Sequence, residues 1–272
     1  MKFSVLLSVY KKENPIYLQQ CFDSIKSQTL QPTEIVLVED GELTPELNAI
    51  VEQLSNEMPN LKIVSYSKNM GLGYALSKGL GHCKYEIVAR MDTDDICKPQ
   101  RFEKEIEYLQ LHSETDIVGA WIDEFIDSTN TVCSTRKVPE NHQEILNFAK
   151  SRKPMNHPTV MFKKTVVINA GGYRSFFYFE DYYLWVRMLQ NGAKFHNIQE
   201  SLLYFRQSKD MFERRGGKEY VLTEIKFYKK LYNTKFIGFP TFIKNITFRT
   251  IIRIIPNRAR SFVYKKLLRN KE

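Results

Sequence analysis

Cysteine is scarce in this sequence of 272 residues, and the few cysteines present form no C-x-x-C pair. A disulfide framework needs several pairable cysteines, and a structural zinc site usually needs closely spaced ones. The spacing therefore argues against both and is typical of a protein in a reducing cytoplasm. The four cysteines are Cys21, Cys83, Cys97 and Cys133.

Long uninterrupted hydrophobic runs are also missing. The apolar start, MKFSVLLSVY, is short and continues into charged residues at 11–13 rather than into a signal-peptide cleavage site, so we interpret it as a buried strand. Residues 236–256 are apolar but contain three basic side chains. Because a membrane span needs about 20 largely uncharged residues, this segment is not a convincing span.

Charge is distributed unevenly along the chain, which has a net charge of +9. Residues 206–272 hold 18 basic and 5 acidic side chains, whereas residues 1–205 are net −4. Basic residues mixed with bulky apolar ones favour a peripheral segment on an anionic inner-membrane surface. The alternative is a helical pair that packs onto the preceding domain and leaves a basic face in solvent. We expect no nucleic-acid partner, because no nucleic-acid-binding module is recognisable.

Up to about residue 110, strand-like and helix-like segments alternate, and this pattern predicts an open α/β sheet of nucleotide-binding type. Each strand–helix–strand unit implies parallel pairing with a right-handed crossover. The predicted strands are 3–9, 33–40, 61–67 and 85–92, and the predicted helices are 16–28, 45–57, 71–81 and one that Pro99 opens.

Beyond Thr115 the alternation weakens. We expect a strand at 116–127 and a further strand leading into a short helix within 158–167. Apolar residues at helical spacing predict helices over 181–192 and 217–232, the first of which Gly192 ends.

Three carboxylates lie close together where the fourth predicted strand ends, in Met91-Asp92-Thr93-Asp94-Asp95. Carboxylates packed this closely repel one another unless a cation neutralises them. Their hard oxygens suit Mg²⁺ or Mn²⁺ bridging a diphosphate, and ligands of open α/β sheets bind at this edge. The alternative is an acidic turn that caps the next helix.

The sequence resembles family 2 glycosyltransferases, and among them the bacterial O-antigen and exopolysaccharide (amylovoran-type) hexosyltransferases. The resemblance covers residues 1–205 and implies a GT-A catalytic domain there, an open and mostly parallel sheet flanked by helices. We predict that residues 206–272 form a basic amphipathic helical extension. The matching segments, in the expected order, are FSVLLSVYKKEN, SIKSQT, EIVLVEDG, NMGLGYALSKGL, EIVARMDTDDICKPQRFEKEIEYL and EDYYLWVRM.

The resemblance implies a nucleotide site at the first two strands. Ser8 and Tyr10 match the residues that meet the nucleotide, with the tyrosine ring on the uracil, and Asp40 matches the acid that reads the uracil edge or the ribose. Gly71 belongs to a loop that closes on the nucleotide. Without the resemblance, these residues are equally consistent with a strand end, a turn and a helix entry.

The metal and donor-sugar contacts follow from the acidic segment. Asp94 matches the more direct metal ligand, and Asp92 matches a residue near the ribose and the metal. Asp95 ligates the metal or contacts the donor sugar, and Arg90 pairs with these acids or with phosphate. His157 matches a histidine near the metal or the pyrophosphate, although a core histidine is an equal alternative.

Asp181 matches the catalytic base, which takes the proton from the acceptor hydroxyl. Without the resemblance, an aspartate at a helix start is more often a cap. We expect burial among the neighbouring aromatic side chains to raise the pKa of Asp181 and make it a stronger base.

The predicted function is an inverting, metal-dependent transfer of a hexose, Glc or Gal, from a UDP-sugar. The predicted acceptor is a lipid-linked saccharide of the GlcNAc-diphospho-undecaprenol type, joined in a β1,3 linkage at the cytoplasmic face of the membrane. Processive relatives carry a Q-x-x-R-W segment that is absent here, so we expect single additions. The alternatives are a sugar-nucleotide nucleotidyltransferase, whose glycine-rich loop is missing at SVYKKEN, and a non-catalytic nucleotide-sugar-binding protein.

Overall fold

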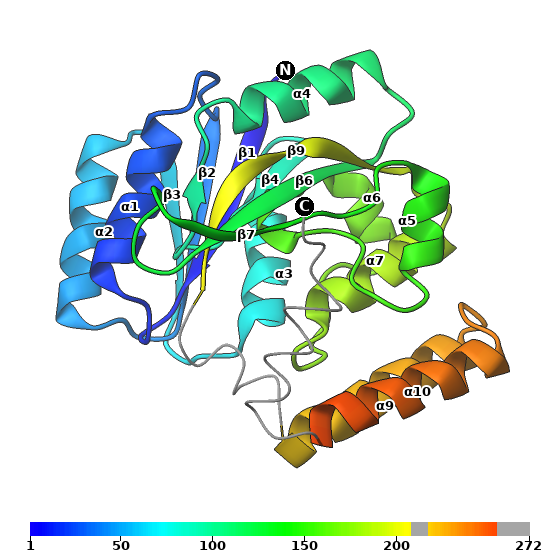
Figure 1. The fold of residues 1–272 in the computed structure, drawn as a ribbon. Helices are drawn as coiled ribbons and strands as arrows, with labels where there is room; N and C mark the ends of the chain where they lie inside the picture. The colour runs from blue at the N-terminus through cyan, green and yellow to red at the C-terminus, as the bar shows by residue number, and fades with distance from the viewer. Residues whose placement is uncertain (208–216, 255–272) are drawn as a thin grey trace.

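The computed structural model describes residues 1–207 and 217–254. A nine-stranded mixed sheet forms the centre, in the order β3-β2-β1-β4-β8-β6-β9-β5, with β7 paired to β6. Helices cover both faces of this sheet, and two C-terminal helices lie beside it (Figure 1). The predicted open α/β sheet is confirmed.

The first four strands are parallel, and helices connect them. Local signals set the helix starts, since Asn14 caps α1 and Thr44 caps α2, each followed by a proline in the first turn. The fourth strand is shorter than predicted. The elements are β1 (Phe3–Val9), α1 (Pro15–Lys26), β2 (Glu34–Asp40), α2 (Pro45–Glu57), β3 (Leu61–Tyr66), α3 (Leu72–His82) and β4 (Ile87–Arg90).

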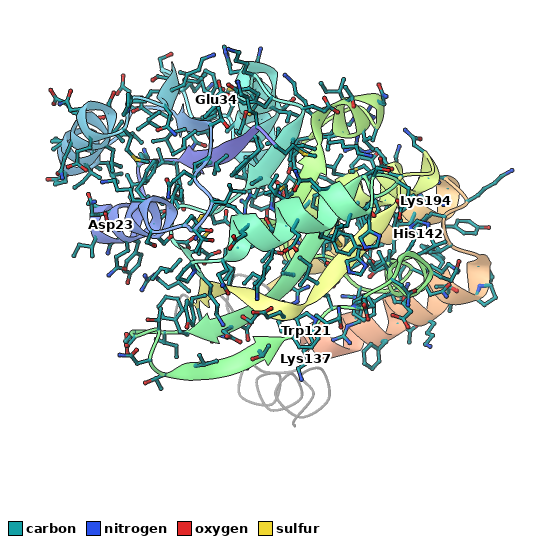
Figure 2. The ribbon with its side chains drawn as sticks, turned by 90° about the horizontal axis from the view of Figure 1, so that it is seen from above. Asp23, Glu34, Trp121, Lys137, His142 and Lys194 are labelled. Atoms are coloured by element: carbon teal, nitrogen blue, oxygen red, sulfur yellow. The ribbon has the colours of Figure 1, made fainter. Side chains whose placement is uncertain are left out.

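Beyond β4 the sheet becomes mixed. β8 pairs antiparallel with β4 and β6, and β9 returns parallel to β6. Trp121 of β6 lies under the Lys137 ammonium, 5.0 Å from the ring centroid (Figure 2). The elements are β5 (Ile96–Cys97), α4 (Arg101–Leu111), β6 (Ile117–Phe125), β7 (Val132–Arg136), α5 (His142–Phe148), η1 (His157–Thr159), β8 (Met161–Lys163), α6 (Lys164–Asn169), α7 (Glu180–Gln190) and β9 (Phe195–Arg206).

Two hydrophobic clusters hold the helices against the sheet. Phe3, Val5 and Leu7 of β1 pack on one face with α1, α2 and α4, whereas Leu6 packs on the other with α3 and α7. Successive side chains of a strand point to opposite faces, so a strand covered on both sides is mostly apolar and carries no unpaired charge. This explains why FSVLLSV carries no charged residue.

The C-terminal helices α9 (Gly217–Asn233) and α10 (Phe239–Ile254) pack on α7 through a third, mostly aromatic cluster. Phe227 of α9 lies 4.7 Å from Phe179 and 4.6 Å from Tyr182, measured between ring centroids. None of the helices within the described ranges is long and apolar enough to cross a membrane. Residues 255–272 of the predicted basic extension lie outside the described part, and the domain boundary at residue 205 remains a prediction.

Candidate active site at the carboxyl edge of the sheet

The predicted donor-binding residues follow neighbouring parallel strands. β1 pairs with β2 on one side and with β4 on the other, so the three strands end at the same edge of the sheet. The Thr93 hydroxyl joins two of these ends, because it donates to the Ser8 carbonyl at 3.3 Å. Thr93 also bonds the Glu13 carboxylate at 2.7 Å.

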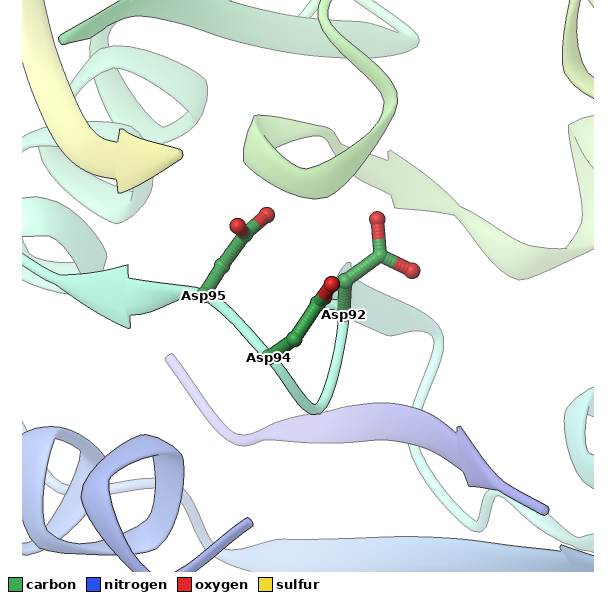
Figure 3. Close-up of side chains that lie close together, drawn as sticks. All are labelled: Asp92, Asp94 and Asp95. Atoms are coloured by element: carbon green, nitrogen blue, oxygen red, sulfur yellow. The ribbon is translucent and has the colours of Figure 1, made fainter. Parts of the chain in front are cut away.

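Asp92, Asp94 and Asp95 form the acidic cluster in the loop between β4 and β5 (Figure 3). One carboxylate oxygen of each lies within 4.8 Å of the others. Asp95 is fully buried, whereas the side chain of Asp92 is 31% exposed. The cluster is therefore open on one side and closed on the other.

The three carboxylates differ in their electrostatics. Burial raises the pKa of Asp92, but its ion pair with the buried Arg90 guanidinium outweighs this effect and lowers the pKa below its usual value. Burial, followed by Asp92 and Glu13, raises the pKa of Asp94 to about 7. Burial and the neighbouring acids also raise the pKa of Asp95. The site thus has more negative charge than its own cations offset.

Buried polar atoms at the cluster test whether a cation fits there. Within the described ranges, Asp95 Oδ2 and the Nε and Nη1 atoms of Arg90 make no hydrogen bond. Such orphaned atoms are rare and call for a specific explanation. Carboxylate oxygens suit hard divalent cations, and a guanidinium with free donors suits phosphate. A cation with a diphosphate therefore fits these residues.

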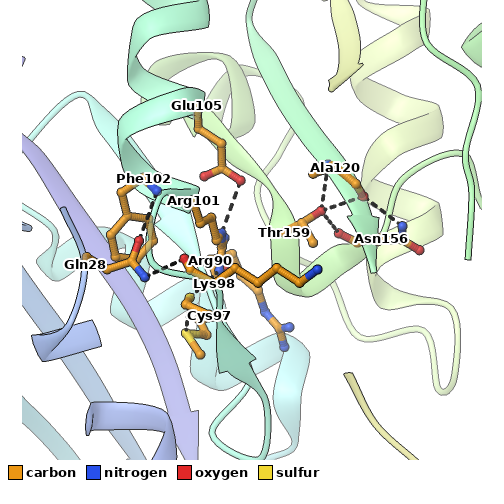
Figure 4. A network of polar contacts seen from close by, with 11 residues as sticks. Gln28, Arg90, Cys97, Lys98, Arg101, Phe102, Glu105, Ala120, Asn156 and Thr159 are labelled. Carbon is orange, nitrogen blue, oxygen red and sulfur yellow. Dashed lines mark hydrogen bonds and ion pairs between the residues drawn. The ribbon is translucent and has the colours of Figure 1, made fainter. Parts of the chain in front are cut away.

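Arg101 contacts residues on both sides of the acidic loop, Arg90 before it and Cys97 after it (Figure 4). Its Nη2 donates to the Arg90 carbonyl at 2.7 Å, its Nη1 lies 3.2 Å from Cys97 Sγ, and its Nε donates to Glu105 at 3.1 Å. Gln28, just beyond α1, ties the same region to that helix, because it accepts from Phe102 N at 3.1 Å and donates to the Ser24 carbonyl of α1 at 3.2 Å. The chain is therefore held both before the acidic loop, at the end of β4, and after it, at β5 and α4.

Arg206, at the end of β9, holds the acidic loop from the opposite side. Its backbone N–H donates to Asp95 Oδ1 at 2.9 Å, and its Nε donates to the Asp94 carbonyl at 3.0 Å. The guanidinium lies over the Tyr17 ring at 3.9 Å. Arg206 falls one residue beyond our predicted catalytic domain, although it is the last residue of β9.

Asp40 and Gly71 lie in direct contact. Asp40 Oδ1 accepts from Met70 N at 2.7 Å, and its Oδ2 accepts from Gly71 N at 2.9 Å. Gly71 has φ +87°, a conformation that favours glycine. Tyr10, just beyond β1, is 39% exposed. Their roles toward a nucleotide remain predictions.

His157 lies in η1, which Asn156 and Thr159 fasten to Ala120 of β6 (Figure 4). Its Nε2 is 3.0 Å from the Tyr173 hydroxyl. Burial lowers the pKa of His157 to about 3, so the ring is neutral. Within the described residues, the clustered ligand atoms come from the three aspartates and not from His157.

Asp181 lies in the first turn of α7 and forms an ion pair that the sequence did not reveal. Lys153 Nζ is 2.7 Å from Asp181 Oδ1 and 2.9 Å from Oδ2. Burial raises the pKa of Asp181, but the Lys153 ammonium and other nearby groups outweigh burial and lower it to about 2. Our expectation of a raised pKa was therefore wrong, because it ignored a cation that approaches from another segment.

Three contributors to the site were missed in the sequence: Glu13, Lys153 and Arg206. Glu13 follows β1 in a charged stretch, and Arg206 follows the apolar run LLYF at the end of β9, so both gave a weak signal as charges at or just after strand ends. Lys153 gave none, because a lysine before a proline, in a loop that also carries Lys150 and Arg152, is ordinary. Only the contact with Asp181 distinguishes it.

The fold, with its cluster of acids at the carboxyl edge of the sheet, is of the GT-A type. Residues 4–181 match the family model "Glycosyl transferase family 2". The chain belongs to this family and is a glycosyltransferase.

Relatives of known activity match nearly the whole chain. A UDP-Gal:α-D-GlcNAc-diphosphoundecaprenol β-1,3-galactosyltransferase of Escherichia coli is 38% identical over 98% of this chain and 97% of its own length. The amylovoran biosynthesis glycosyltransferase AmsE of Erwinia amylovora is 40% identical over 97% of this chain and 98% of its own. The chain is therefore similar to transferases of bacterial O-antigen and exopolysaccharide synthesis.

A solved structure confirms the fold. The mannosyltransferase PcManGT of Pyrobaculum calidifontis, in complex with GDP-Man and Mn²⁺, has a TM-score of 0.64 and 14% identity. The match covers 98% of this chain and 75% of that one.

Proposed function

We propose that this enzyme transfers galactose from UDP-Gal, with inversion, to the GlcNAc of a GlcNAc-diphospho-undecaprenol-type acceptor in a β1,3 linkage. The E. coli relative supports this choice of donor, acceptor and linkage, because it is 38% identical over nearly the full length of both chains. UDP-Glc is the second donor that we propose to test. The observation that carries the proposal is the cluster of three carboxylates within 4.8 Å at the edge of the sheet.

We propose that Asp94 and Asp92 ligate a divalent cation, Mn²⁺ or Mg²⁺. When bound, the cation neutralises the diphosphate and makes it a better leaving group. Asp95 orients the donor sugar, and Arg90 offers its unpaired donors to phosphate. His157 is a third proposed metal contact, and its Nε2 atom is already 3.0 Å from the Tyr173 hydroxyl.

Ser8, Tyr10, Asp40 and Gly71 hold the nucleoside in this proposal. The exposed Tyr10 ring offers a stacking surface for the uracil. Each Asp40 oxygen already accepts one backbone N–H, and a carboxylate oxygen has a second lone pair for a donor from the base or ribose.

Asp181 acts as the general base. The acceptor hydroxyl oxygen bonds to the anomeric carbon from the side opposite the diphosphate, the bond from that carbon to the phosphate oxygen breaks, and UDP leaves. The hydroxyl proton passes to Asp181, which is ionised at neutral pH because its pKa is about 2. The Lys153 ammonium must give up part of its contact as the proton arrives.

We propose further that α9 and α10 dock the enzyme on the anionic cytoplasmic face of the membrane, where a lipid-linked acceptor is found. Exposed apolar side chains alternate with exposed lysines on these helices, as expected for an interfacial surface. The apolar residues are Leu222, Tyr232, Phe239, Ile243 and Phe248, and the lysines are Lys226, Lys229, Lys230 and Lys244.

A UDP-release assay tests the transfer. The protein is incubated with Mn²⁺ and one of UDP-Gal, UDP-Glc, UDP-GlcNAc or UDP-GalNAc, with and without a GlcNAc-diphospho-lipid analogue. We expect acceptor-dependent release from UDP-Gal, no release with EDTA, and loss of release in Asp181→Asn. Binding of UDP without release from any donor contradicts the proposed substrates and supports a non-catalytic binding protein instead.

A further inference from the structure

The proposed base depends on a loop that has no regular structure of its own. Lys153, which binds both oxygens of Asp181, lies between α5 and η1. Pro154 follows it and restricts its backbone to an extended conformation. The position of the ammonium is therefore set by whatever fixes the residues just before it.

Three successive carbonyls before Lys153 are fixed by side chains of other helices. The Tyr182 hydroxyl donates to Ala149 O at 2.8 Å. From the C-terminal pair, Asn245 Nδ2 donates to Lys150 O at 2.9 Å and the Tyr228 hydroxyl donates to Ser151 O at 2.8 Å. Carbonyls at and beyond a helix C-terminus lack intrahelical partners, so such donors set the course of the chain there.

Arg249 of α10 adds a further donor to the same place. Its Nη2 donates to Ser151 O, and its Nη1 pairs with Glu224 of α9 at 2.7 Å. Glu224 is buried, as are Tyr228 and Asn245. We call Tyr228, Asn245 and Arg249 the carbonyl clamp. A buried, hydrogen-bonded group of this kind holds its partners in one geometry.

The α9–α10 pair also contacts α7, the helix that carries Asp181. Phe179 and Tyr182, on either side of Asp181 in sequence, pack against Phe227 of α9. The α9–α10 pair therefore contacts both the helix that carries the carboxylate and the loop that carries the ammonium.

We propose that the α9–α10 pair is a positioning element for the base: through the carbonyl clamp it fixes Lys153, and through Lys153 it orients the Asp181 carboxylate toward the acceptor hydroxyl. This inference rests on the proposed role of Asp181. It gives the C-terminal helices a function inside the catalytic site in addition to any contact with a membrane.

A double-mutant cycle tests the inference, with kcat measured on a soluble short-chain acceptor analogue so that membrane docking plays no part. The clamp variant Tyr228→Phe/Asn245→Ala removes two donors and keeps the Arg249–Glu224 pair. Lys153→Met removes the ammonium. Since a misplacement of about 1 Å can cost about a hundredfold in rate, we expect kcat to fall about tenfold in the clamp variant and about a hundredfold in Lys153→Met.

The variant that combines the clamp substitutions with Lys153→Met decides whether the clamp acts through Lys153. If the clamp acts through Lys153, the combined variant has the kcat of Lys153→Met alone, and KM for the UDP-sugar stays unchanged in all variants. A purely structural role of the helices gives effects that multiply, which overturns the inference, as does an unchanged kcat in the clamp variant. Thr247→Ala is the matched control, because Thr247 is exposed on α10 between Asn245 and Arg249.

Two further variants keep the result interpretable. If the double clamp variant does not fold, as circular dichroism shows, Asn245→Ala alone goes through the same cycle. Asp181→Asn separates the two levels of inference. If it retains the wild-type kcat, the proposed base is wrong, whereas its loss of activity beside multiplying clamp effects overturns only the positioning role.

Discussion

The proposed donor side and the proposed base side of the site are built in different ways. The donor side draws Arg90 and its three acids from residues 90–95, at the end of a single strand. The base side pairs Asp181 with a lysine 28 residues away, and the donors of the carbonyl clamp lie 77 to 98 residues from their acceptors. The proposed diphosphate site is therefore a local motif, whereas the proposed base site depends on long-range contacts.

The largest expected effect comes from one variant on each side of the site, in which UDP binding and kcat should respond differently. Asp94→Asn should abolish metal-dependent UDP binding, whereas Asp181→Asn should bind UDP as the wild type does. Because general base catalysis contributes about 10²- to 10⁴-fold, we expect kcat of Asp181→Asn to fall about a thousandfold. Calorimetry with UDP and Mn²⁺, beside the release assay, measures both.

Glu180→Gln is the matched control, because Glu180 is the adjacent carboxylate in α7 and has no proposed role in proton transfer. A loss of UDP binding in Asp181→Asn contradicts the division of the site into two sides.

The next effect concerns the buried pair that supports the donor side. Arg101 and Glu105 are one helical turn apart and fully buried. Burial, only partly offset by Arg101, raises the pKa of Glu105 from 4.5 to about 7. A raised pKa in the folded state means stability that is present below the unfolded pKa and lost as pH rises through about 7.

The shift in the pKa of Glu105 corresponds to a loss of about 3 kcal/mol in the free energy of unfolding as the pH rises from the unfolded pKa of Glu105 to its folded pKa. Thermal unfolding from pH 5 to 8 should therefore show a steeper fall in the wild type than in Glu105→Gln. Parallel curves for the two proteins contradict the assigned pKa. The exposed pair Lys104–Glu200 serves as control, since removal of Glu200 should change stability by less than about 1 kcal/mol at every pH.

Arg206 provides a smaller effect, and it tests whether the donor side is truly local. Arg206→Gln removes the bond from the guanidinium to the Asp94 carbonyl but keeps the backbone N–H that binds Asp95. We expect kcat/KM to fall about thirtyfold, about 2 kcal/mol, with a higher Mn²⁺ requirement. A variant with the wild-type Mn²⁺ requirement shows that the acidic loop needs no remote support.

The smallest effect on turnover is expected from the exposed lysines of α9. Lys226→Ala/Lys229→Ala/Lys230→Ala should keep the wild-type kcat on a soluble acceptor and lose affinity for anionic vesicles. Each lysine near such a surface contributes about 1 kcal/mol, so we expect at least roughly a tenfold loss in vesicle co-sedimentation. Neutral vesicles are the control, and equal binding of both proteins to anionic vesicles removes the membrane proposal.

The predictable part of this molecule is the part in which local patterns decide the structure. The alternation up to residue 110 correctly predicted the first four strands and the helices between them, because strand and helix periods depend on neighbouring residues. The boundaries of α2 agree with the prediction, since Thr44 and Pro45 mark its start. The acids of residues 92–95 were found because a single strand end carries them all.

The unpredicted part depends on pairs that are far apart in sequence. Neither the short β5 nor the β6–β7 hairpin was expected, since two to five residues carry too little periodicity. The pKa of Asp181 was predicted in the wrong direction for a related reason. Burial is visible in an aromatic sequence, but the approach of Lys153 is not.

The sequence by itself determined the parallel half of the sheet, the acidic cluster at its edge and the family, because each rests on residues close together in the chain. Only the tertiary structure decided that Arg206 closes the acidic loop, that Lys153 binds Asp181 and that the C-terminal helices hold the loop before Lys153. The physical reason is that side chains from distant segments meet only after the whole sheet has formed, and no local propensity records which of them will meet.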